Sequence, residues 1–404
     1  MDDARPSPHV IELSRPTPSS RILAGGGHLT LITANGAGFT SGRGVLLTKW
    51  SGDATLDSDG LFVYVRDREV FEHWIPGRPA SGDGGRIKSV WEPGVFTLEQ
   101  EHAGLMARLE ICIDPHGGEL RRVILTNRSG RRRWLDLTTA AEIALDDPAA
   151  YARHPVFSNL FLQTEYVPQE RALLVSRRPR GSDEACPWLI HALLTGGLPE
   201  YETDRCRFIG RGGRLVSPWS MPTAAPLTGT VGNVLDPLVA LRLTITLDAG
   251  ESAGAVFLLG AASDREAALG MARACVGERG IRDAFARARE TARCDLDDRG
   301  LTASEAAYLQ DLAGAMLYAD PRLRAGPETR ARARGSVSDL GRYGLAPDRV
   351  LAVLHVDGDA GRGLRPAVRS AARYWRDLGL YIDVIEIADD ADRVVAEDGV
   401  TVLP

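Results

Sequence analysis

Residues 241–248 alternate strictly between apolar and polar side chains. Leu241, Leu243, Ile245 and Leu247 point to one side of the predicted pleat, and Arg242, Thr244, Thr246 and Asp248 point to the other. This is the period of an antiparallel strand with one buried face. The polar connection before it, from Tyr201 onward, is punctuated by Gly229, Gly232 and Pro237. It should run over the surface at one end of a sheet, where ligands usually meet such a fold.

The same rhythm extends over residues 21–262, where short alternating runs are separated by clusters of Gly, Pro, Asn and Asp. That pattern predicts an all-β sandwich. The expected strands include Leu29–Thr33, Val45–Trp50, Leu61–Arg66, Phe96–His102, Leu105–Ile113, Leu120–Thr126 and Trp134–Ile143. The last three are expected to form an antiparallel meander, with Asn127–Gly130 as a hairpin loop between the final two.

The pattern changes after Ala262. Asp264–Cys275 and Arg279–Cys294 predict helices, and a third helix begins at Thr302 with an apolar stripe at helical spacing. The final segment predicts a parallel strand–helix–strand unit and one further short strand: Val350–Val356, Gly363–Leu378, Tyr381–Ile387 and Gly399–Leu403. We therefore expect a poorly ordered lead-in (1–20), a β-supersandwich (21–262), a helical linker (263–335) and a small α/β unit (336–404).

Composition excludes several classes of function. The net charge of -6 and the pI near 5.8 argue against a nucleic-acid binder, because such binding depends on basic surface. Five cysteines without a CxxC pair suit a reduced, cytoplasmic chain. No apolar run approaches the roughly 18 residues of a membrane span. No His pair has the spacing of a helical metal site, and a calcium-loop register at 55–66 would place Arg66 at the last ligand position, so we expect no metal and no cofactor.

Several long segments resemble one carbohydrate-active family. YETDR at 201–205, RFIGRG at 207–212, LTGTVGNVLDP at 227–237 and HPVFSNLFLQTEYV at 154–167 are similar to the N-terminal region of glycoside hydrolase family 94. That family includes cellobiose and chitobiose phosphorylases and the C-terminal part of cyclic β-1,2-glucan synthases, which resemble this chain more closely. The resemblance covers nearly the whole chain. It implies a mainly β fold, a galactose-mutarotase-like supersandwich, followed by a helical linker and a small α/β unit.

In that family, catalysis takes place in a helical barrel, which we do not expect within these 404 residues, so the resemblance supplies no catalytic residue. It implies a non-catalytic module that binds β-glucan or a glucose-containing oligosaccharide. Alternatives are one subunit of a split phosphorylase or glycosyltransferase, with its catalytic barrel on a separate chain, and a mutarotase-like enzyme. A mutarotase would need a His and a Glu on the concave face, for which His154 with Glu165, or His191 with Glu202, are candidates. Partners left open are that catalytic chain, through which this one could associate with the inner membrane, and a second copy in a homodimer.

The candidate sugar contacts lie in the segments that carry the resemblance. A pyranose is bound by an aromatic platform with flanking carboxylates or arginines for its hydroxyl groups. Trp50 with Asp53, and Asp204 and Arg205 with Asp236, have these chemistries. The competing interpretation is structural, with Trp50 a core residue at a strand end and Asp204 and Arg205 a surface ion pair.

Overall fold

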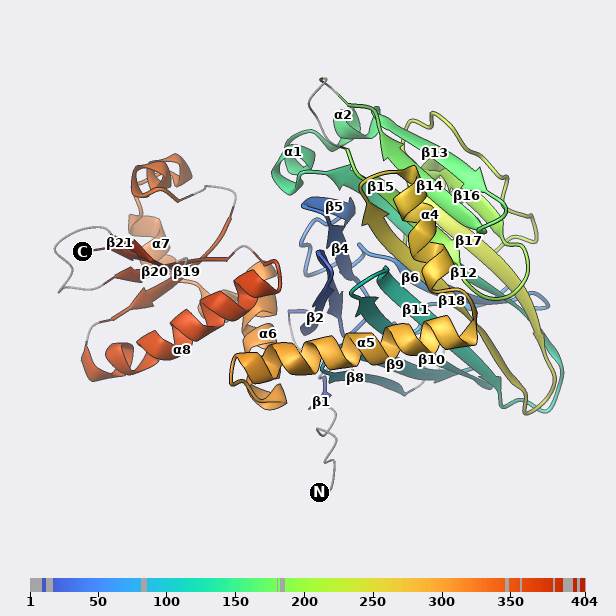
Figure 1. Ribbon diagram of the computed structural model, residues 1–404, viewed down its shortest axis with the longest axis horizontal. Coiled ribbons are helices and arrows are strands. Elements are labelled where there is room, and N and C mark those ends of the chain that lie inside the picture. The colour runs from blue at the N-terminus through green and yellow to red at the C-terminus, as the bar shows by residue number, and fades with distance from the viewer. Residues whose placement is uncertain are drawn as a thin grey trace. The chain divides into compact units, whose positions relative to one another are not determined.

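A computed structural model describes residues 9–11, 17–80, 86–179, 181, 186–345, 349–356, 358–380, 382–387, 395–397 and 400–403. The chain divides into two compact units, Met1–Ser304 and Glu305–Pro404. The fold is mostly β, as the alternation predicted, and each unit is described by itself (Figure 1). The expected lead-in at 1–20 lies partly outside the described residues, and the boundaries expected at 20, 262 and 335 stay predictions.

The first unit contains two large sheets. The first has nine antiparallel strands, in the order β1 (His9–Val10), β8 (Ile87–Glu92), β9 (Val95–His102), β10 (Leu105–Asp114), β11 (Gly118–Asn127), β18 (Ser252–Ala262), β15 (Trp188–Leu193), β14 (Ala172–Arg177) and β13 (Leu162–Val167). The second has the order β16 (Glu200–Asp204), β17 (Pro237–Leu247), β12 (Arg133–Asp146), β5 (Val45–Thr48), β4 (Gly38–Gly42), β3 (His28–Thr33) and β2 (Ser20–Gly25), with β6 (Phe62–Asp67) on β12 and β7 (His73–Trp74) on β6. The expected strands are therefore present.

The two sheets face each other across a mainly apolar core that polar contacts cross at several places. Thr139 on β12 is 2.8 Å from His191 Nε2 on β15. His28 Nε2 on β3 accepts a hydrogen bond from the backbone N–H of Ala261 on β18, at 3.0 Å. Because a buried polar group without a partner is costly, these bridges fix how the sheets face one another.

One expected connection is wrong. The segment Asn127–Gly130 does not close a hairpin, because β11 pairs with β10 and β18 in the first sheet while β12 pairs with β17, β6 and β5 in the second. The Asn127 side-chain amide donates to the carbonyls of Arg131 (2.7 Å), Leu247 (3.1 Å) and Asp248 (3.0 Å). These bonds anchor a loop that crosses between the sheets. A short polar loop with a glycine suits either connection, so its sequence did not distinguish them.

Helices cover the other face of the first sheet. α4 (Arg265–Ala274) and α5 (Gly277–Asp298) confirm the two helices expected after Ala262. Asp264 caps α4 by accepting a hydrogen bond from the N–H of Ala267 at 2.9 Å. Leu269 on α4 and Phe285 on α5 are buried in one apolar cluster with residues of β9, β10, β14, β15 and β18. Three short helices, α1 (Pro148–Arg153), α2 (Pro155–Asn159) and α3 (Arg205–Phe208), lie in connections between strands.

The second unit confirms the parallel strand–helix–strand prediction. Its elements are α6 (Ala303–Leu317, which begins just before the unit boundary), η1 (Pro321–Leu323), α7 (Pro327–Arg332), η2 (Val337–Tyr343), β19 (Val350–His355), α8 (Gly358–Asp377), β20 (Ile382–Ile387), β21 (Val395–Glu397) and β22 (Val400–Leu403). β19, β20 and β22 are parallel, and β21 is antiparallel to β22. The stripe of α6 has a partner in α8, where the indole of the buried Trp375 donates to the carbonyl of Leu309 at 2.9 Å.

The buried His191 predicts that the sandwich loses stability in mild acid. Burial lowers its pKa from 6.5 to about 4, so between these pH values the unfolded chain binds a proton that the native state does not. Stability should therefore fall as the pH drops, by about 2 kcal/mol from this group between pH 7 and pH 5. Urea unfolding of the wild type and of His191→Asn at both pH values measures the difference. An equally steep loss in the variant would contradict this role.

Candidate functional site

The outer face of the second sheet carries an unusual number of charged groups. On β12 this face presents Asp136, Thr138, Ala140 and Glu142, which are neighbours at the two-residue period of a strand. The connection from α3 to β17, residues 209–236, covers the middle of the face. Buried residues from both form one apolar cluster: Phe62, Tyr64, Ala140, Phe208, Ile209, Leu215, Met221, Leu238 and Ala240. The charged ends of the face therefore lie on either side of an apolar centre.

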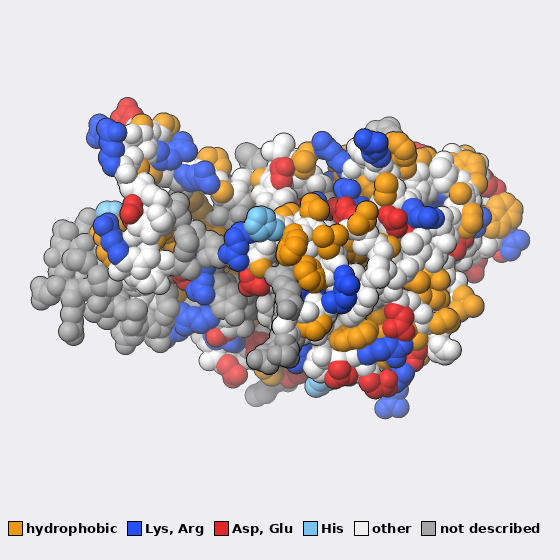
Figure 2. All heavy atoms as spheres, turned by 90° about the horizontal axis from the view of Figure 1, so that it is seen from above, with side chains coloured by type: hydrophobic (Ala, Val, Ile, Leu, Met, Phe, Trp, Pro, Cys, Tyr) orange, Lys and Arg blue, Asp and Glu red, His pale blue; other side chains and the backbone are white. Residues whose placement is uncertain are grey.

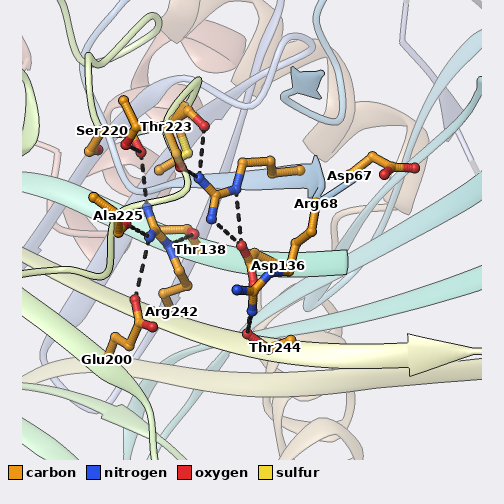
Figure 3. Close-up of polar contacts among 12 residues, drawn as sticks. Asp67, Arg68, Asp136, Thr138, Glu200, Ser220, Thr223, Ala225, Arg242 and Thr244 are labelled. Atoms are coloured by element: carbon orange, nitrogen blue, oxygen red, sulfur yellow. Dashed lines mark hydrogen bonds and ion pairs between the residues drawn. The ribbon is translucent and has the colours of Figure 1, made fainter. Parts of the chain in front are cut away.

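At one end, a buried ion pair holds the covering loop (Figure 3). Arg66 on β6 pairs with Asp136 on β12, and their side chains are 2% and 0% exposed. The guanidinium donates from Nε to Asp136 at 3.0 Å and also to the backbone carbonyls of Met221 and Thr223 in the loop. Asp136 in turn accepts a hydrogen bond of 2.6 Å from Thr244 on β17. One cation thus connects the sheet to two points of the loop.

Arg242 on β17 reinforces the attachment. It donates to the carbonyls of Ser220 and Ala225, both at 3.2 Å, and lies 3.4 Å from Glu200 (Figure 3). Burial and the neighbouring positive charge of Arg66 lower the pKa of Arg242. Backbone carbonyls therefore replace part of the water that both guanidiniums lose. Residues 220–225 are held in place by these bonds even though most of their side chains are exposed.

At the other end of the outer face, the covering loop places the Asp236 carboxylate in a second cluster of polar residues. Arg205, the first residue of α3, donates from Nε to Glu142 on β12 and lies 3.6 Å from Asp236, the last loop residue. Asp236 also accepts a hydrogen bond of 3.0 Å from the side-chain amide of Asn159 on α2. Lys49 lies 3.6 Å from Glu142. We call Lys49, Glu142, Asn159, Arg205 and Asp236 the rim cluster.

The electrostatics of the rim cluster reflect two nearby carboxylates bridged by one guanidinium. Burial raises the pKa of Asp236, the charge of Glu142 adds to this, and Arg205 opposes it. Burial also raises the pKa of the Tyr151 phenol, with contributions from Glu142, Asp236 and Asp59. Both carboxylates accept hydrogen bonds from cations or amides, so the rim cluster can bind hydroxyl groups through acceptors and donors that lie side by side.

Apolar side chains adjoin the rim cluster. Val156, Phe157 and Leu160, in and just after α2, and Leu235 in the loop are exposed, with Leu235 at 79%. Asn159 and Asp236 join these two segments by their hydrogen bond. Figure 2 looks onto the end of the sandwich that carries α1 and α2, and it shows hydrophobic side chains gathered beside charged ones there. A ligand at the rim cluster would thus meet both polar and apolar surface.

The structure brings together two of the five expected sugar contacts. Arg205 and Asp236, 31 positions apart, form part of the rim cluster. Asp204 instead caps α3, where it accepts a hydrogen bond from the N–H of Cys206 at 2.8 Å. Trp50 is half-buried and packs against Phe39, with ring centroids 4.8 Å apart. Asp53 accepts hydrogen bonds from two N–H groups of its own turn. Asp204 and Asp53 therefore have local structural contacts.

Sequence reasoning missed Lys49, Glu142 and Asn159. A signal was present for Glu142, because a charged residue in the middle of a long apolar strand must have a buried or edge partner. Lys49 precedes Trp50 directly, in a segment that the resemblance had already identified. It could therefore have been included among the candidate contacts. Asn159 had no signal, since its contact with Asp236 depends on how α2 packs.

Three of the four residues in the expected histidine–glutamate pairs have other partners. His191 is buried between the sheets, and its Nδ1 lies 2.9 Å from the carbonyl of Leu258, so it is not on an outer face. Glu165 pairs with Arg265 of α4, and Glu202 accepts hydrogen bonds from the N–H groups of Thr203 and Asp204. These contacts do not support a mutarotase-like centre at either pair.

No group of three or more His, Cys, Asp or Glu side chains suited to a metal ion occurs in the part of the chain that the structure describes. The acidic loop after Trp50 illustrates why. Asp57 accepts a hydrogen bond of 2.9 Å from the Thr33 hydroxyl, and Asp59 accepts two from Ser51. Asp57 is thus bonded to β3, and Asp59 is bonded within its own loop.

The family model described as "Glycosyl hydrolase 94, supersandwich domain" matches residues 9–276, well over half of the chain. The chain belongs to this family. The match includes both sheets, the covering loop and the rim cluster, and it agrees with the supersandwich fold described above. The family match therefore indicates a carbohydrate-related domain.

Two curated relatives are longer proteins. Cyclic beta-(1,2)-glucan synthase NdvB from Rhizobium meliloti (strain 1021) is 29% identical over 402 residues, which are 96% of this chain and 14% of the relative. Solabiose phosphorylase from Paenibacillus borealis is 26% identical over 229 residues, or 56% of this chain and 29% of the relative. The chain therefore spans less than a third of either protein's length.

Among solved structures, a galactose mutarotase-like protein from Clostridium acetobutylicum gives a TM-score of 0.36 at 9% identity, covering 65% of this chain and all of that one.

No helix within the described ranges has both the length and the apolar character needed to cross a membrane.

Removing the buried carboxylate should release the covering loop. Asp136→Asn leaves the buried guanidinium of Arg66 without its counter-charge, and we expect a loss of roughly 3–5 kcal/mol in the free energy of unfolding. Asp248→Asn is the matched control, because Asp248 pairs with Arg132 on the surface, where both side chains are more than half exposed. That change should cost less than about 1 kcal/mol. Denaturant unfolding measures both, and equal losses would contradict the role of Asp136.

Proposed function

We propose that this supersandwich is a non-catalytic carbohydrate-binding module that binds β-glucan at the rim cluster. The observation that carries the proposal is the position of Arg205 between Glu142 and Asp236, with Asn159 and Lys49 beside them. The family and the two curated relatives, a glucan synthase and a phosphorylase, support a glucose-containing ligand. The protein would then take part in β-glucan metabolism, as the names of the two curated relatives suggest.

The chemistry of the rim cluster suits a neutral, hydroxyl-rich ligand. Neighbouring hydroxyl groups of a pyranose each donate and accept, so they need carboxylate acceptors and guanidinium or amide donors within a few ångströms of each other. Asp236 and Arg205 are 46% and 29% exposed at their side chains, so both can exchange water for a ligand. The exposed apolar residues Phe157 and Leu235 offer a surface for the C–H face of a sugar ring.

Binding is favoured over catalysis because of the partners that the carboxylates already have. Glu142 is engaged by Arg205 and Lys49, and Asp236 by Arg205 and Asn159. A general acid must be free to deliver its proton to the glycosidic oxygen. Burial raises the pKa of Asp236, as a general acid needs, but Arg205 and Asn159 already engage its carboxylate. We therefore propose that any glycosyl transfer is carried out by a catalytic domain elsewhere in the protein or on a separate chain.

A cytoplasmic location is part of the proposal. It is supported by the five cysteines, all of which are free thiols and two of which, Cys206 and Cys294, are exposed. Exposed free thiols are typical of reducing compartments.

Calorimetric titration with linear and cyclic β-1,2-glucan tests the function. We expect millimolar or tighter binding by the wild type and a loss of at least about tenfold for Arg205→Met, because the bridging donor is removed. Arg207→Met is the matched control, since Arg207 lies on the same helix and contacts Asp204 and Thr228 instead. Asp236→Asn and Trp50→Ala, titrated in parallel, separate the rim cluster from the aromatic candidate.

No heat with any glucan at millimolar concentration would remove the binding proposal. Binding that is weakened by Trp50→Ala but unchanged in Arg205→Met would move the site away from the rim cluster.

A further inference from the structure

Trp219 lies in the covering loop with 62% of its surface exposed. A large and mainly apolar side chain is costly to leave in water, and tryptophan is on average well buried. The apolar cluster beneath the loop contains Ile209, Leu215 and Met221 from the same segment, but Trp219 is not among its members. Packing of the core therefore does not explain why a tryptophan stands here.

The indole of Trp219 lies flat on Gly210. A Cβ atom added at Gly210 would lie 2.5 Å from Cδ2 of the indole, 2.6 Å from Cγ and 2.9 Å from Cε3. Cδ2 joins the other two atoms and is nearer than both, as happens when a ring is contacted through its face. A larger residue at 210 would displace the ring, and the φ of +84° there favours glycine as well. Since most of the side chain is exposed, the opposite face of the ring is open among the described residues.

The backbone that carries Trp219 is fixed to the rest of the sandwich. The N–H of Trp219 donates to the carbonyl of Ile209 at 3.1 Å, and the N–H of Ser220 donates to that of Phe208 at 3.2 Å. The carbonyl of Ser220 accepts a hydrogen bond of 3.2 Å from the buried Arg242 (Figure 3). An indole has only two side-chain torsions, so a ring on such a backbone loses little entropy when a ligand binds.

α3 connects this ring to the rim cluster. The N–H of Ile209 donates to the carbonyl of Arg205 at 2.8 Å, and the N–H of Gly210 donates to that of Cys206 at 3.1 Å, so the helical turns continue from Arg205 to Gly210. At a rise of 1.5 Å per residue, Gly210 lies about 7.5 Å from Arg205 along the helix axis. The indole on Gly210 and the rim cluster are therefore close enough for one sugar chain to contact both.

We propose that the indole of Trp219 is a stacking platform for one glucosyl unit of the glucan whose neighbouring unit binds at the rim cluster. The C–H groups of a glucopyranose form an apolar face that fits a flat aromatic ring, while the hydroxyl groups of the next unit meet Arg205 and Asp236. This inference rests on the proposed function, because it extends the same site. It assigns the aromatic contact to Trp219, whereas Trp50 is half-buried and packs against Phe39.

Titration of the full chain with linear β-1,2-glucan, followed by calorimetry and by tryptophan fluorescence, tests the platform. We expect Trp219→Leu to weaken binding at least about fivefold, because an aliphatic side chain offers no flat face. Trp219→Phe keeps a smaller ring and should weaken binding less, and it carries the test if Trp219→Leu fails to fold. The change in emission on binding should be largely lost in both variants, since the indole that the sugar covers is absent.

Trp134→Leu is the matched control. Trp134 is also exposed, at 46%, but it lies eight positions from Glu142 on β12, which is about 26 Å along the strand. This variant should keep both the affinity and the emission change of the wild type. Equal weakening by Trp134→Leu and Trp219→Leu would overturn the platform, because the effect would not depend on where the ring lies.

Arg205→Met, titrated in parallel, separates the platform from the rim cluster. Weaker binding by Arg205→Met, together with wild-type affinity and emission change in Trp219→Leu, would overturn the platform and leave the rim cluster as the glucan site. Weaker binding by Trp219→Leu without an effect of Arg205→Met would support the platform and remove the rim cluster. If the wild type binds no glucan, both proposals fail.

Discussion

The buried pair of Arg66 and Asp136 is the interaction on which the outer face of the sandwich depends. Without Asp136, two guanidiniums would lie beneath the covering loop, with Glu200, the Thr138 hydroxyl and backbone carbonyls as their remaining acceptors. With it, the same carbonyls become partners that fix residues 220–225 against the sheet. Such a pair contributes little net stability compared with an apolar core, but it specifies one conformation because breaking it is costly. Here that conformation positions the segment ending at Asp236.

The rim cluster follows from that constraint. Asp236 directly precedes β17, so its position is determined by the strand on one side and by the attached loop on the other. Arg205 begins α3 immediately after β16, and Glu142 lies on β12, two strands away from β16 in the sheet order. Three neighbouring strands therefore supply the three charged groups. A site built on paired strands and the residues that adjoin them is more rigid than one built on a free loop, which favours binding with little reorganisation.

The sequence was sufficient for the strands, the helices after Ala262 and the parallel unit, because each depends on local periodicity such as the alternation at 241–248. It failed at Asn127–Gly130, where the choice between a hairpin and a crossing loop depends on carbonyls of residues 247 and 248 that lie far away in sequence. It identified Arg205 and Asp236 through a family resemblance, and it missed Asn159 because a contact between a short helix and a loop has no sequence period. Asp204 carries the same carboxylate group as Asp236 but caps α3. Only the backbone geometry distinguishes a helix cap from a member of the rim cluster.

The central claim is that the covering loop and the strand ends together form a sugar-binding surface at Glu142, Arg205 and Asp236. The most direct test is a crystal structure of the chain in complex with a short β-1,2-gluco-oligosaccharide. Our account predicts a pyranose ring within hydrogen-bonding distance of the Arg205 guanidinium and the Asp236 carboxylate, with the loop in the same conformation as described. An oligosaccharide bound at another surface, with these side chains still bonded only to each other, would contradict it.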